Sequence, residues 1–516
     1  MKKLSLAMLA LCGVLSLTSC GNDIKFYNSN VMIEITNTPR NGDIISPKQV
    51  EVTETLHSLQ KDMMYNTRVL PSVGDVKILV VPVVLPGYDF IDINGDERDD
   101  MAKVKNDLNQ AFFGGDNLAF ESVSSYYYKS SYGKLNITGT VTEWMYLNID
   151  TNLNYESAAQ IDIDQTPDVI EAAVEWVRNT QDIDLTEYDN DKDGYIDGVW
   201  CIYSCPNYTN GGPSTDYGNY WAYTSWGNQL EEDGQAPNLL KPVYNLFGWA
   251  SYDFMYEAGI DKIDSHIYIH ETGHFLGLND YYSDSMTYSP TGRVDMMDAN
   301  IGDMNSYSKM LLGWTKPYLV NGKGKIQLYT MENENNCIVI PADDVYFDDG
   351  KFSPFGEYIL IELYTNEGLN EYDSIVKLPS RPKAYAGKGV RIYHVDNRKF
   401  YVDFADNYNI VTKEYEGEEI DSEHKIIIPI TNNRGLDVYN QLLNFDYNYN
   451  LFDEIRMIEA TNKDSFSNGG IQNERSYFHE GDVFSVTKYC ENFFVNGDSF
   501  NNGKTCSYEV TVGRVR

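Results

Sequence analysis

The chain has 516 residues, 42% of them hydrophobic, and a formal net charge of −37 at pH 7. This length exceeds one ordinary hydrophobic core, so we expect about two to four domains. So large an acidic excess disfavours nucleic acid and anionic lipid as partners, and it suits a cation-rich extracytoplasmic setting.

The first 20 residues, MKKLSLAMLALCGVLSLTSC, have the features of an export signal. Two lysines precede an apolar run from Leu4 to Leu17, which is shorter than the roughly 20 residues that a spanning helix needs. Leu17 and Ser19 precede Cys20 as in a bacterial lipobox, so we expect residues 1–20 to be a lipoprotein signal peptide and Cys20 to carry the lipid. An incidental cysteine is the alternative. The mature chain would then be lipid-anchored to a bacterial cell membrane, on the periplasmic side or the cell surface.

Residues 21–66 are polar and weakly periodic, which predicts a tether or a short pro-segment. A folded domain begins after them with VKILVVPVVL at 76–85, which is a continuous apolar strand signal. Pro82 within this run favours an edge strand or a bulge, because proline cannot donate to a sheet ladder.

Mixed helix and strand signals continue to about residue 317. Helix-like spacing occurs at 105–113 and 122–134, whereas KLNITGTVTEW alternates like a strand. TPDVIEAAVEWV begins a clear helix, with Thr166 as N-cap and Pro167 in the first turn. We therefore expect one mixed domain over 67–318.

From residue 319 onward the sequence changes character. Short strand signals such as KIQLYTM, EYILIELY and GVRIYHVD are separated by Gly, Asn and Asp turns, and convincing helices are scarce. This texture predicts an all-β, sandwich-like region over 319–516. The expected fold class is therefore α+β, with more than one domain.

Five cysteines follow Cys20, and the odd number leaves at least one of them unpaired within the chain. Cys490 and Cys506 are the pair that we would test for a disulfide. Cys201 and Cys205 lie in an apolar, strand-like run, where buried free thiols and a bridge are equally compatible with the sequence.

The strongest chemical motif is HETGH, which places His270 and His274 one helical turn apart, so that both imidazoles can grip one ion. Glu271 is adjacent to the first histidine, where it can polarise a water on the metal without binding the metal itself. Gly277 would end the helix and turn the chain back, so that Asp280 returns as an oxygen ligand. Three protein ligands leave a fourth position for water, as a catalytic zinc site requires.

His266 lies on the same helical face, but about 6 Å further along the axis. We therefore expect it beside the site or at the surface, without metal ligation. The bare HExxH pattern occurs by chance in long chains, whereas the extended form HExxHxxGxxD in an exported protein is much more specific.

This segment resembles the motif of bacterial metallopeptidases similar to immune inhibitor A, which are related to the metzincins. Their motif looks like HExGHxxGxxD followed by aromatic residues, as in HETGHFLGLNDYY. The stretch 294–314, VDMMDANIGDMNSYSKMLLGW, is similar to their methionine turn beneath the metal, with Met297 as the turn methionine. The likeness covers most of 74–400. Asn279 stands where the family usually has proline, and the stretch after Cys20 is short for its propeptide.

The resemblance implies a zincin-type zinc endopeptidase domain that acts on proteins or peptides. Glu271 would take a proton from the metal-activated water and pass it to the leaving amine. The oxyanion needs a further donor, and Tyr307 or Tyr282 would supply it, a choice that the sequence leaves open. The rival interpretation is a non-catalytic surface lipoprotein that uses the scaffold to bind a glycan or a host protein; the presence of Glu271 argues against it.

A second metal motif is DNDKDGYID, at 189–197, where alternating aspartates surround a tight turn at Gly194. Hard oxygen ligands spaced two apart can wrap one calcium ion, with the carbonyl of Tyr195 completing the set. The predicted calcium ligands are Asp189, Asp191, Asp193 and Asp197. The twelfth position is not glutamate, so the loop is no EF-hand, and the alternative is a solvated acidic turn. The stretch 92–100 is a poorer match, because Glu97 replaces the turn glycine, and a solvated loop suits it at least as well.

Overall fold

The computed structural model describes residues 24–36, 48–63, 68–214, 219–227, 236–256, 260–282, 288–320, 322–342, 347–348, 351–405, 408–414, 417, 420, 424–427, 453–493, 500 and 508–516. The expected signal peptide with Cys20 lies outside the described residues, and so does the expected disulfide, because Cys506 and the side chain of Cys490 are not described.

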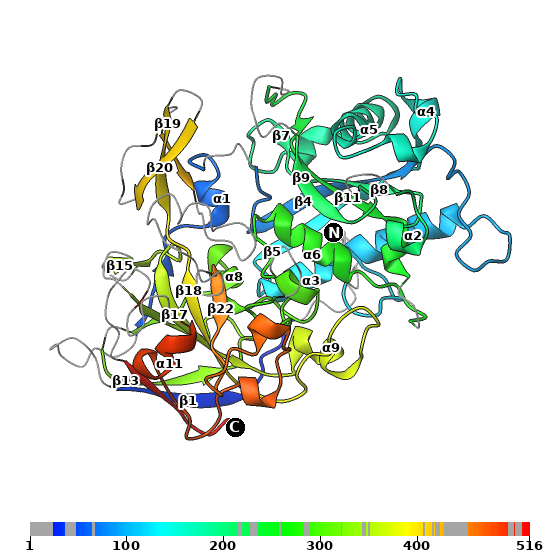
Figure 1. Ribbon diagram of the computed structural model, residues 1–516. Helices are drawn as coiled ribbons and strands as arrows, with labels where there is room; N and C mark the ends of the chain where they lie inside the picture. Colours follow the sequence, from blue (N-terminus) through cyan, green and yellow to red (C-terminus); the bar gives the residue numbers. More distant parts are fainter. Residues whose placement is uncertain are drawn as a thin grey trace, which may run out of the picture.

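A mixed six-stranded sheet forms the centre of the first half of the chain (Figure 1). Its order is β5-β4-β8-β11-β9, with β6 pairing to the end of β4. All neighbours pair in parallel except β9, which is antiparallel to β11 at the edge of the sheet. The strands are β4 (Gly74–Val84), β5 (Leu135–Val141), β6 (Met145–Tyr146), β8 (Val199–Tyr203), β9 (Tyr223–Trp226) and β11 (Leu246–Ser251).

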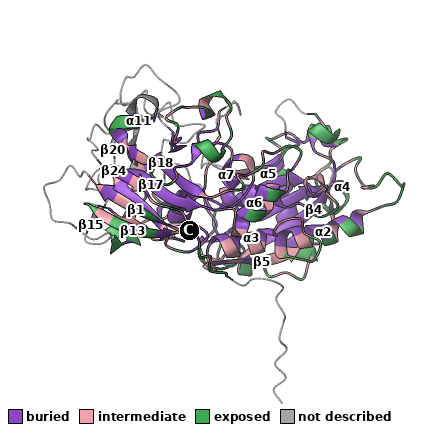
Figure 2. Cartoon of the chain, turned by 90° about the horizontal axis from the view of Figure 1, so that it is seen from below, coloured by how far each residue is buried: buried purple, intermediate pink, exposed green. Residues whose placement is uncertain are grey.

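Helices cover both faces of this sheet. The long ones are α2 (Met101–Phe113), α3 (Val123–Ser130), α5 (Thr166–Thr180) and α6 (His266–Phe275). Three of them, α2, α3 and α6, share a hydrophobic cluster with Ile78 of β4, whereas α5 packs in a second cluster with Leu79. Successive strand residues point to opposite faces, so a continuous apolar strand such as β4 can supply both clusters. Figure 2 shows β4 largely in the colour of buried residues.

Pro82 does not lie on an edge strand, which corrects the expectation. It stands in β4, between β5 and β8, and is in register with Ile202 of β8. The pairing with β5 ends at Val80, and the pairing with β6 begins only at Val83. Proline is tolerated here because, on the side of β4 opposite β8, it falls at the gap between two partner strands, where its missing N–H interrupts neither the pairing with β5 nor that with β6.

Two facing sheets form the second half of the molecule, which we call the sandwich half. Most of their strands come from residues 318–512, and β1 and β2 come from the N-terminal segment. One has the order β2-β12-β14-β17-β18-β22 and the other β13-β1-β24-β23. Aliphatic side chains of both sheets share one cluster, for example Ile33 of β1, Ile338 of β14 and Ile359 of β17. Their strands are β1 (Asn30–Thr36), β2 (Lys48–Gln49), β12 (Tyr318–Leu319), β13 (Gly324–Tyr329), β14 (Cys337–Pro341), β17 (Glu357–Tyr364), β18 (Gly389–Asp396), β22 (Ile455–Met457), β23 (Val483–Ser485) and β24 (Glu509–Val512). The expected α+β class with a sandwich-like second half is confirmed.

The N-terminal segment differs from a free tether. Strand β1 lies inside its sheet, antiparallel to both β13 and β24, so that the first described strand pairs with the last one (Figure 1). Val31, Ile33 and Ile35 are at most 1% exposed. The alternation of apolar and polar residues over this short run is a strand signal that the polar composition of 21–66 conceals.

Other α-helices and strands lie outside the three sheets and four helices described above. They are α1 (Leu56–Leu59), α4 (Leu147–Asp150), α7 (Met296–Ala299), α8 (Ser306–Leu311), α9 (Glu371–Ile375), α11 (Val486–Phe493), β3 (Glu51–Val52), β7 (Tyr195–Ile196), β10 (Val243–Tyr244), β15 (Phe347–Asp348), β16 (Lys351–Phe352), β19 (Phe400–Ala405), β20 (Tyr408–Glu414) and β21 (His424–Ile427). Across the described ranges, no helix combines the length and the apolar character needed to cross a membrane.

Candidate active site

Helix α6 carries both motif histidines on its buried side. Nδ1 of His270 lies 2.7 Å from the carbonyl oxygen of Met296, and Nδ1 of His274 lies 2.7 Å from that of Leu278. In a neutral imidazole, an Nδ1–H that donates to a carbonyl leaves Nε2 as the free acceptor. The backbone therefore selects the tautomer in which both Nε2 atoms can bind a metal.

The turn after α6 returns the chain to the histidines. Gly277 adopts φ +91°, and the amide of Leu278 donates to the carbonyl of Gly273 at 3.1 Å. A left-handed glycine one or two residues beyond the last helical turn is the usual helix-ending geometry. Three residues later, Asp280 points back at the helix.

Asp280 closes a three-residue cluster with donor atoms suited to zinc. Its Oδ1 lies 3.0 Å from Nε2 of His270 and 3.3 Å from Nε2 of His274. Zinc holds such ligands at about 2.0–2.1 Å in a tetrahedron, whose edges are then about 3.3 Å. Oδ1 is buried without a hydrogen-bond partner among the described residues, so its lone pairs are available. Two imidazoles and one carboxylate at this spacing fit a catalytic zinc ion.

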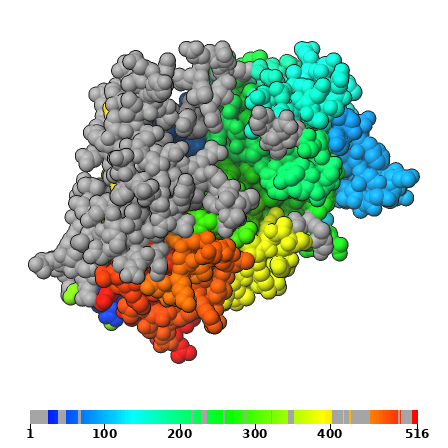
Figure 3. Space-filling view, in the orientation of Figure 1, coloured from blue at the N-terminus to red at the C-terminus, as the bar shows by residue number. Residues whose placement is uncertain are grey.

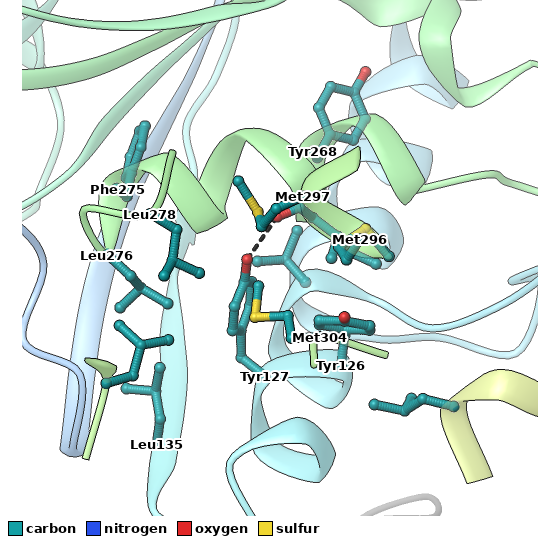
Figure 4. Close-up of a cluster of buried hydrophobic side chains, with 14 of the residues drawn as sticks. Tyr126, Tyr127, Leu135, Tyr268, Phe275, Leu276, Leu278, Met296, Met297 and Met304 are labelled. Carbon is teal, nitrogen blue, oxygen red and sulfur yellow. Dashed lines mark hydrogen bonds between the residues drawn. The ribbon is translucent and has the colours of Figure 1, made fainter. Parts of the chain in front are cut away.

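Met297 lies beneath the helix, as the resemblance implies. It belongs to α7, and a Cβ added at Gly273 would come within 2.3 Å of its sulfur. Figure 4 shows Met297 against α6, with the hydroxyl of Tyr127 donating to the carbonyl of Ile269 at 2.6 Å. Gly273 lies between the two histidines in sequence, so this close packing supports the part of the helix that bears them.

Glu271 faces a cleft beside the cluster. The cavity has a volume of about 450 Å³, and its lining includes Glu271, His274 and Asp280. Burial raises the pKa of the Glu271 carboxyl above its ordinary value, against the opposing charges of His274 and His270. A carboxyl with a raised pKa is suited to exchange protons near neutral pH.

Apolar and aromatic side chains form one part of the remaining cleft wall. Trp221 and Trp226 line it from the segment around edge strand β9. Leu56, Leu59 and Met63 line it from α1 and the residue stretch after it. A segment that we expected as a tether or pro-segment therefore contributes to the cavity. Such a wall suits a substrate with bulky apolar side chains.

The structure separates the two candidate oxyanion donors. Tyr282 lines the cleft, and burial together with the charge of Asp280 raises the pKa of its hydroxyl, which therefore keeps its proton. Tyr307 is fully buried outside the cleft lining, and its hydroxyl donates to Glu454 at 2.6 Å. Tyr307 is therefore not placed to meet a substrate, and Tyr282 is retained as the candidate donor.

His266 is not part of the cluster of His270, His274 and Asp280, which we call the zinc-type cluster. It is the first residue of α6 and is 0% exposed, so the expectation of a surface position is wrong. Its Nδ1 lies 2.5 Å from Asp264 and its Nε2 3.3 Å from Asp373. Although burial lowers the pKa of His266, the charges of these two aspartates outweigh it and raise the pKa to about 9. The residue is thus part of a buried ion-pair network.

The second predicted metal motif forms a compact loop with three converging carboxylates. Oxygen atoms of Asp189, Asp191 and Asp197 lie within 4.8 Å of one another. Asp193 is outside this group, because its Oδ2 pairs with Nε of Arg68 at 3.2 Å. The turn glycine is required, since a Cβ at Gly194 (φ +91°) would lie 2.6 Å from the amide nitrogen of Asn238. Burial raises the pKa of Asp197 to about 8.

The structure also bears on the acidic stretch 92–100 and on the cysteine pair Cys201 and Cys205. In the stretch 92–100, Asp92 accepts hydrogen bonds from the amides of Asn94, Gly95, Asp96 and Glu97, which is the geometry of a self-contained turn. It is not among the groups of described residues that could hold a metal. Cys201 and Cys205 are buried free thiols, and burial raises the pKa of each above its ordinary value.

Comparison with known proteins identifies the region. Residues 105–308 match the family described as immune inhibitor A peptidase M6, catalytic domain. No curated protein matches the chain. The family resemblance is confirmed, and the matched region contains α6, the turn to Asp280 and the methionine turn. It is therefore a metallopeptidase domain, which implies protein or peptide substrates and a metal.

Proposed function

The chain carries the catalytic domain of an immune inhibitor A-type metallopeptidase, and from this premise we propose that it is an exported, lipid-anchored zinc endopeptidase of extracellular proteins. The observation that carries the zinc assignment is the convergence of His270, His274 and Asp280 on one point beside a cleft. Export and anchoring rest on the signal-like first 20 residues that end in Cys20.

Zinc bound by these three ligands would supply Lewis acidity, which lowers the pKa of a water molecule and polarises a peptide carbonyl. Glu271 is the general base: its carboxylate accepts the proton of the attacking water and then gives it to the leaving amine. Tyr282 donates a hydrogen bond to the oxygen that becomes negative at the carbonyl carbon. The apolar wall of Trp221, Trp226 and Leu59 binds a side chain and excludes water.

We also assign a structural calcium ion to the loop 189–197. Asp189, Asp191 and Asp197 offer hard oxygen ligands within the reach of one ion, and their mutual repulsion is relieved by a cation. Asp193, which the sequence included, is bound by Arg68 and is not needed as a direct ligand.

The substitution Glu271→Gln tests the enzyme proposal against the binding-lipoprotein alternative. Glutamine keeps the shape of the side chain but cannot accept a proton at neutral pH. General-base assistance is typically worth about 10²- to 10⁴-fold, so casein hydrolysis by the zinc-loaded, folded protein should fall by roughly that factor. Zinc content and melting temperature should stay near those of the parent.

A matched control for this experiment is Glu175→Gln, because Glu175 lies on α5 and forms surface ion pairs with Arg178 and Lys241. Its hydrolysis rate should equal that of the parent. If the folded, zinc-loaded parent cuts neither casein nor a peptide library, or if Glu271→Gln cuts as fast, the peptidase proposal fails and a binding role becomes the better hypothesis.

A further inference from the structure

The loop that carries Asp280 is held by a residue from the other half of the molecule. Asn279 immediately precedes Asp280, and its Nδ2 donates to Oε2 of Glu454 at 3.0 Å. The other carboxylate oxygen of Glu454 accepts from the hydroxyl of Tyr307 at 2.6 Å. Glu454 is only 2% exposed, and the residue directly after it begins strand β22 of the sandwich. Both oxygens of this buried carboxylate are therefore engaged by the catalytic half.

Residues next to Glu454 also form hydrogen bonds with the segment that follows Asp280 in the sequence, at Tyr288 and Pro290. Tyr288 donates to Asp453 and accepts from Nη1 of Arg456 at 2.8 Å. The amide of Met457 donates to the carbonyl of Pro290 at 3.0 Å. Residues 453–457 are themselves buried, and in Figure 3 the orange surface residues of this part of the chain lie beside yellow and green ones. The start of β22 thus docks on residues that follow the zinc-type cluster.

We propose that Glu454 is a positioning residue, which fixes Asn279 and thereby presents Asp280 to the metal. The inference rests on the proposed zinc site. Histidine ligands on a helix are held by the helix itself, whereas Asp280 sits on the irregular stretch beyond Gly277. A buried carboxyl group that accepts two hydrogen bonds out of reach of water can hold such a stretch in one conformation. The sandwich half therefore completes the metal site, although it supplies no ligand.

The zinc dissociation constant measures this role directly and does not depend on turnover. Partners that orient metal ligands typically contribute about 10- to 100-fold to metal affinity, so Asn279→Ala and Glu454→Ala should each weaken zinc binding in that range. Glu454 acts through Asn279, so the two losses should not add. The double variant Asn279→Ala/Glu454→Ala should therefore have about the same zinc dissociation constant as the single variant that binds zinc less tightly. Cobalt substituted for zinc should show an altered visible spectrum in each variant.

Glu459→Gln is the matched control, because Glu459 is a buried carboxylate of the same half that accepts from Ser465 within that half. It should lower the melting temperature without changing zinc affinity. Asn279→Ala decides the matter if Glu454→Ala fails to fold. Parental zinc affinity in Asn279→Ala, or additive losses in the double variant, would overturn the positioning role and leave the peptidase proposal intact. A folded parent that binds no zinc overturns both.

Discussion

The hydroxyl of Thr224 lies 3.0 Å from the backbone carbonyl oxygen of Glu271 and 3.2 Å from its carboxylate oxygen Oε2. Thr224 belongs to edge strand β9, and Glu271 belongs to α6. One side chain therefore connects the edge of the sheet to the proposed general base. No motif spacing marks Thr224 in the sequence, because its partner is 47 residues away.

Removing this hydroxyl should impair catalysis without affecting metal binding. Hydrogen bonds to charged groups contribute about 1.5–3 kcal/mol, so Thr224→Val should lower kcat by roughly 10- to 100-fold. Zinc content should not change. Thr224→Ser keeps the hydroxyl and is the control, which should retain most of the activity. Turnover of Thr224→Val at the parental rate would show that Glu271 is oriented without this contact.

Substitution of Asp280 should remove zinc, whereas substitution of His266 should keep zinc and lower the melting temperature. Two histidines alone hold zinc loosely, so Asp280→Ala should lose zinc and activity together. His266→Gln should keep zinc, but it leaves Asp264 and Asp373 with one fewer cation in a buried site and should lower the melting temperature. Metal analysis and thermal melting of both variants check this. Full zinc in Asp280→Ala with depleted zinc in His266→Gln would reverse the ligand assignment.

Calcium should raise the melting temperature of the protein with zinc held constant. A ligand that binds only the folded state at about 100 times its dissociation constant contributes about 2.7 kcal/mol. Asp189→Asn should abolish the shift, because Asp189 belongs to the converging group, whereas Asp193→Asn should preserve most of it. A melting curve unmoved by millimolar calcium, or a larger loss in Asp193→Asn than in Asp189→Asn, contradicts the assigned site.

The ion-pair network at the start of α6 should make stability depend on pH. His266 has a pKa of about 9 in the folded protein, which is above its unfolded value. Its contribution is therefore fully present below about pH 6.5 and is lost as the pH rises through about 9, with a total on the order of 3 kcal/mol. Asp264, Asp373, Tyr372 and Arg381 surround the ring, and Arg381 pairs with Asp264 at 3.1 Å.

The measurement is the difference in melting temperature between the zinc-loaded parent and His266→Gln from pH 6 to pH 10. Titrations common to both proteins cancel in this difference. The advantage of the parent should shrink as the pH rises. A constant or growing advantage would show that His266 is neutral in the folded protein.

Local sequence sufficed for the elements whose contacts are local. The two motif histidines are one turn apart, and Gly277 needs a left-handed conformation only a few residues later, so the path to Asp280 is encoded within 11 residues. The start of helix α5 was predicted to within one residue: proline lies in its first turn as expected, but the N-cap is Gln165, and Thr166 is the first helical residue. The order of α+β and β-rich halves follows from periodicity, which is also a local property.

Tertiary structure alone decided which distant residues meet. Strand β1 pairs with β13 and β24, although its own periodicity cannot name a partner some hundreds of residues away. Tyr282 and Tyr307 have the same side chain, so the sequence cannot choose between them. In the structure Tyr307 is buried and its hydroxyl donates to Glu454, which excludes Tyr307 as a donor in the cleft. Asn279 and Glu454 are 175 residues apart. Hydrogen bonds and packing act over a few ångströms in space, so sequence separation carries no information about them until the chain has folded.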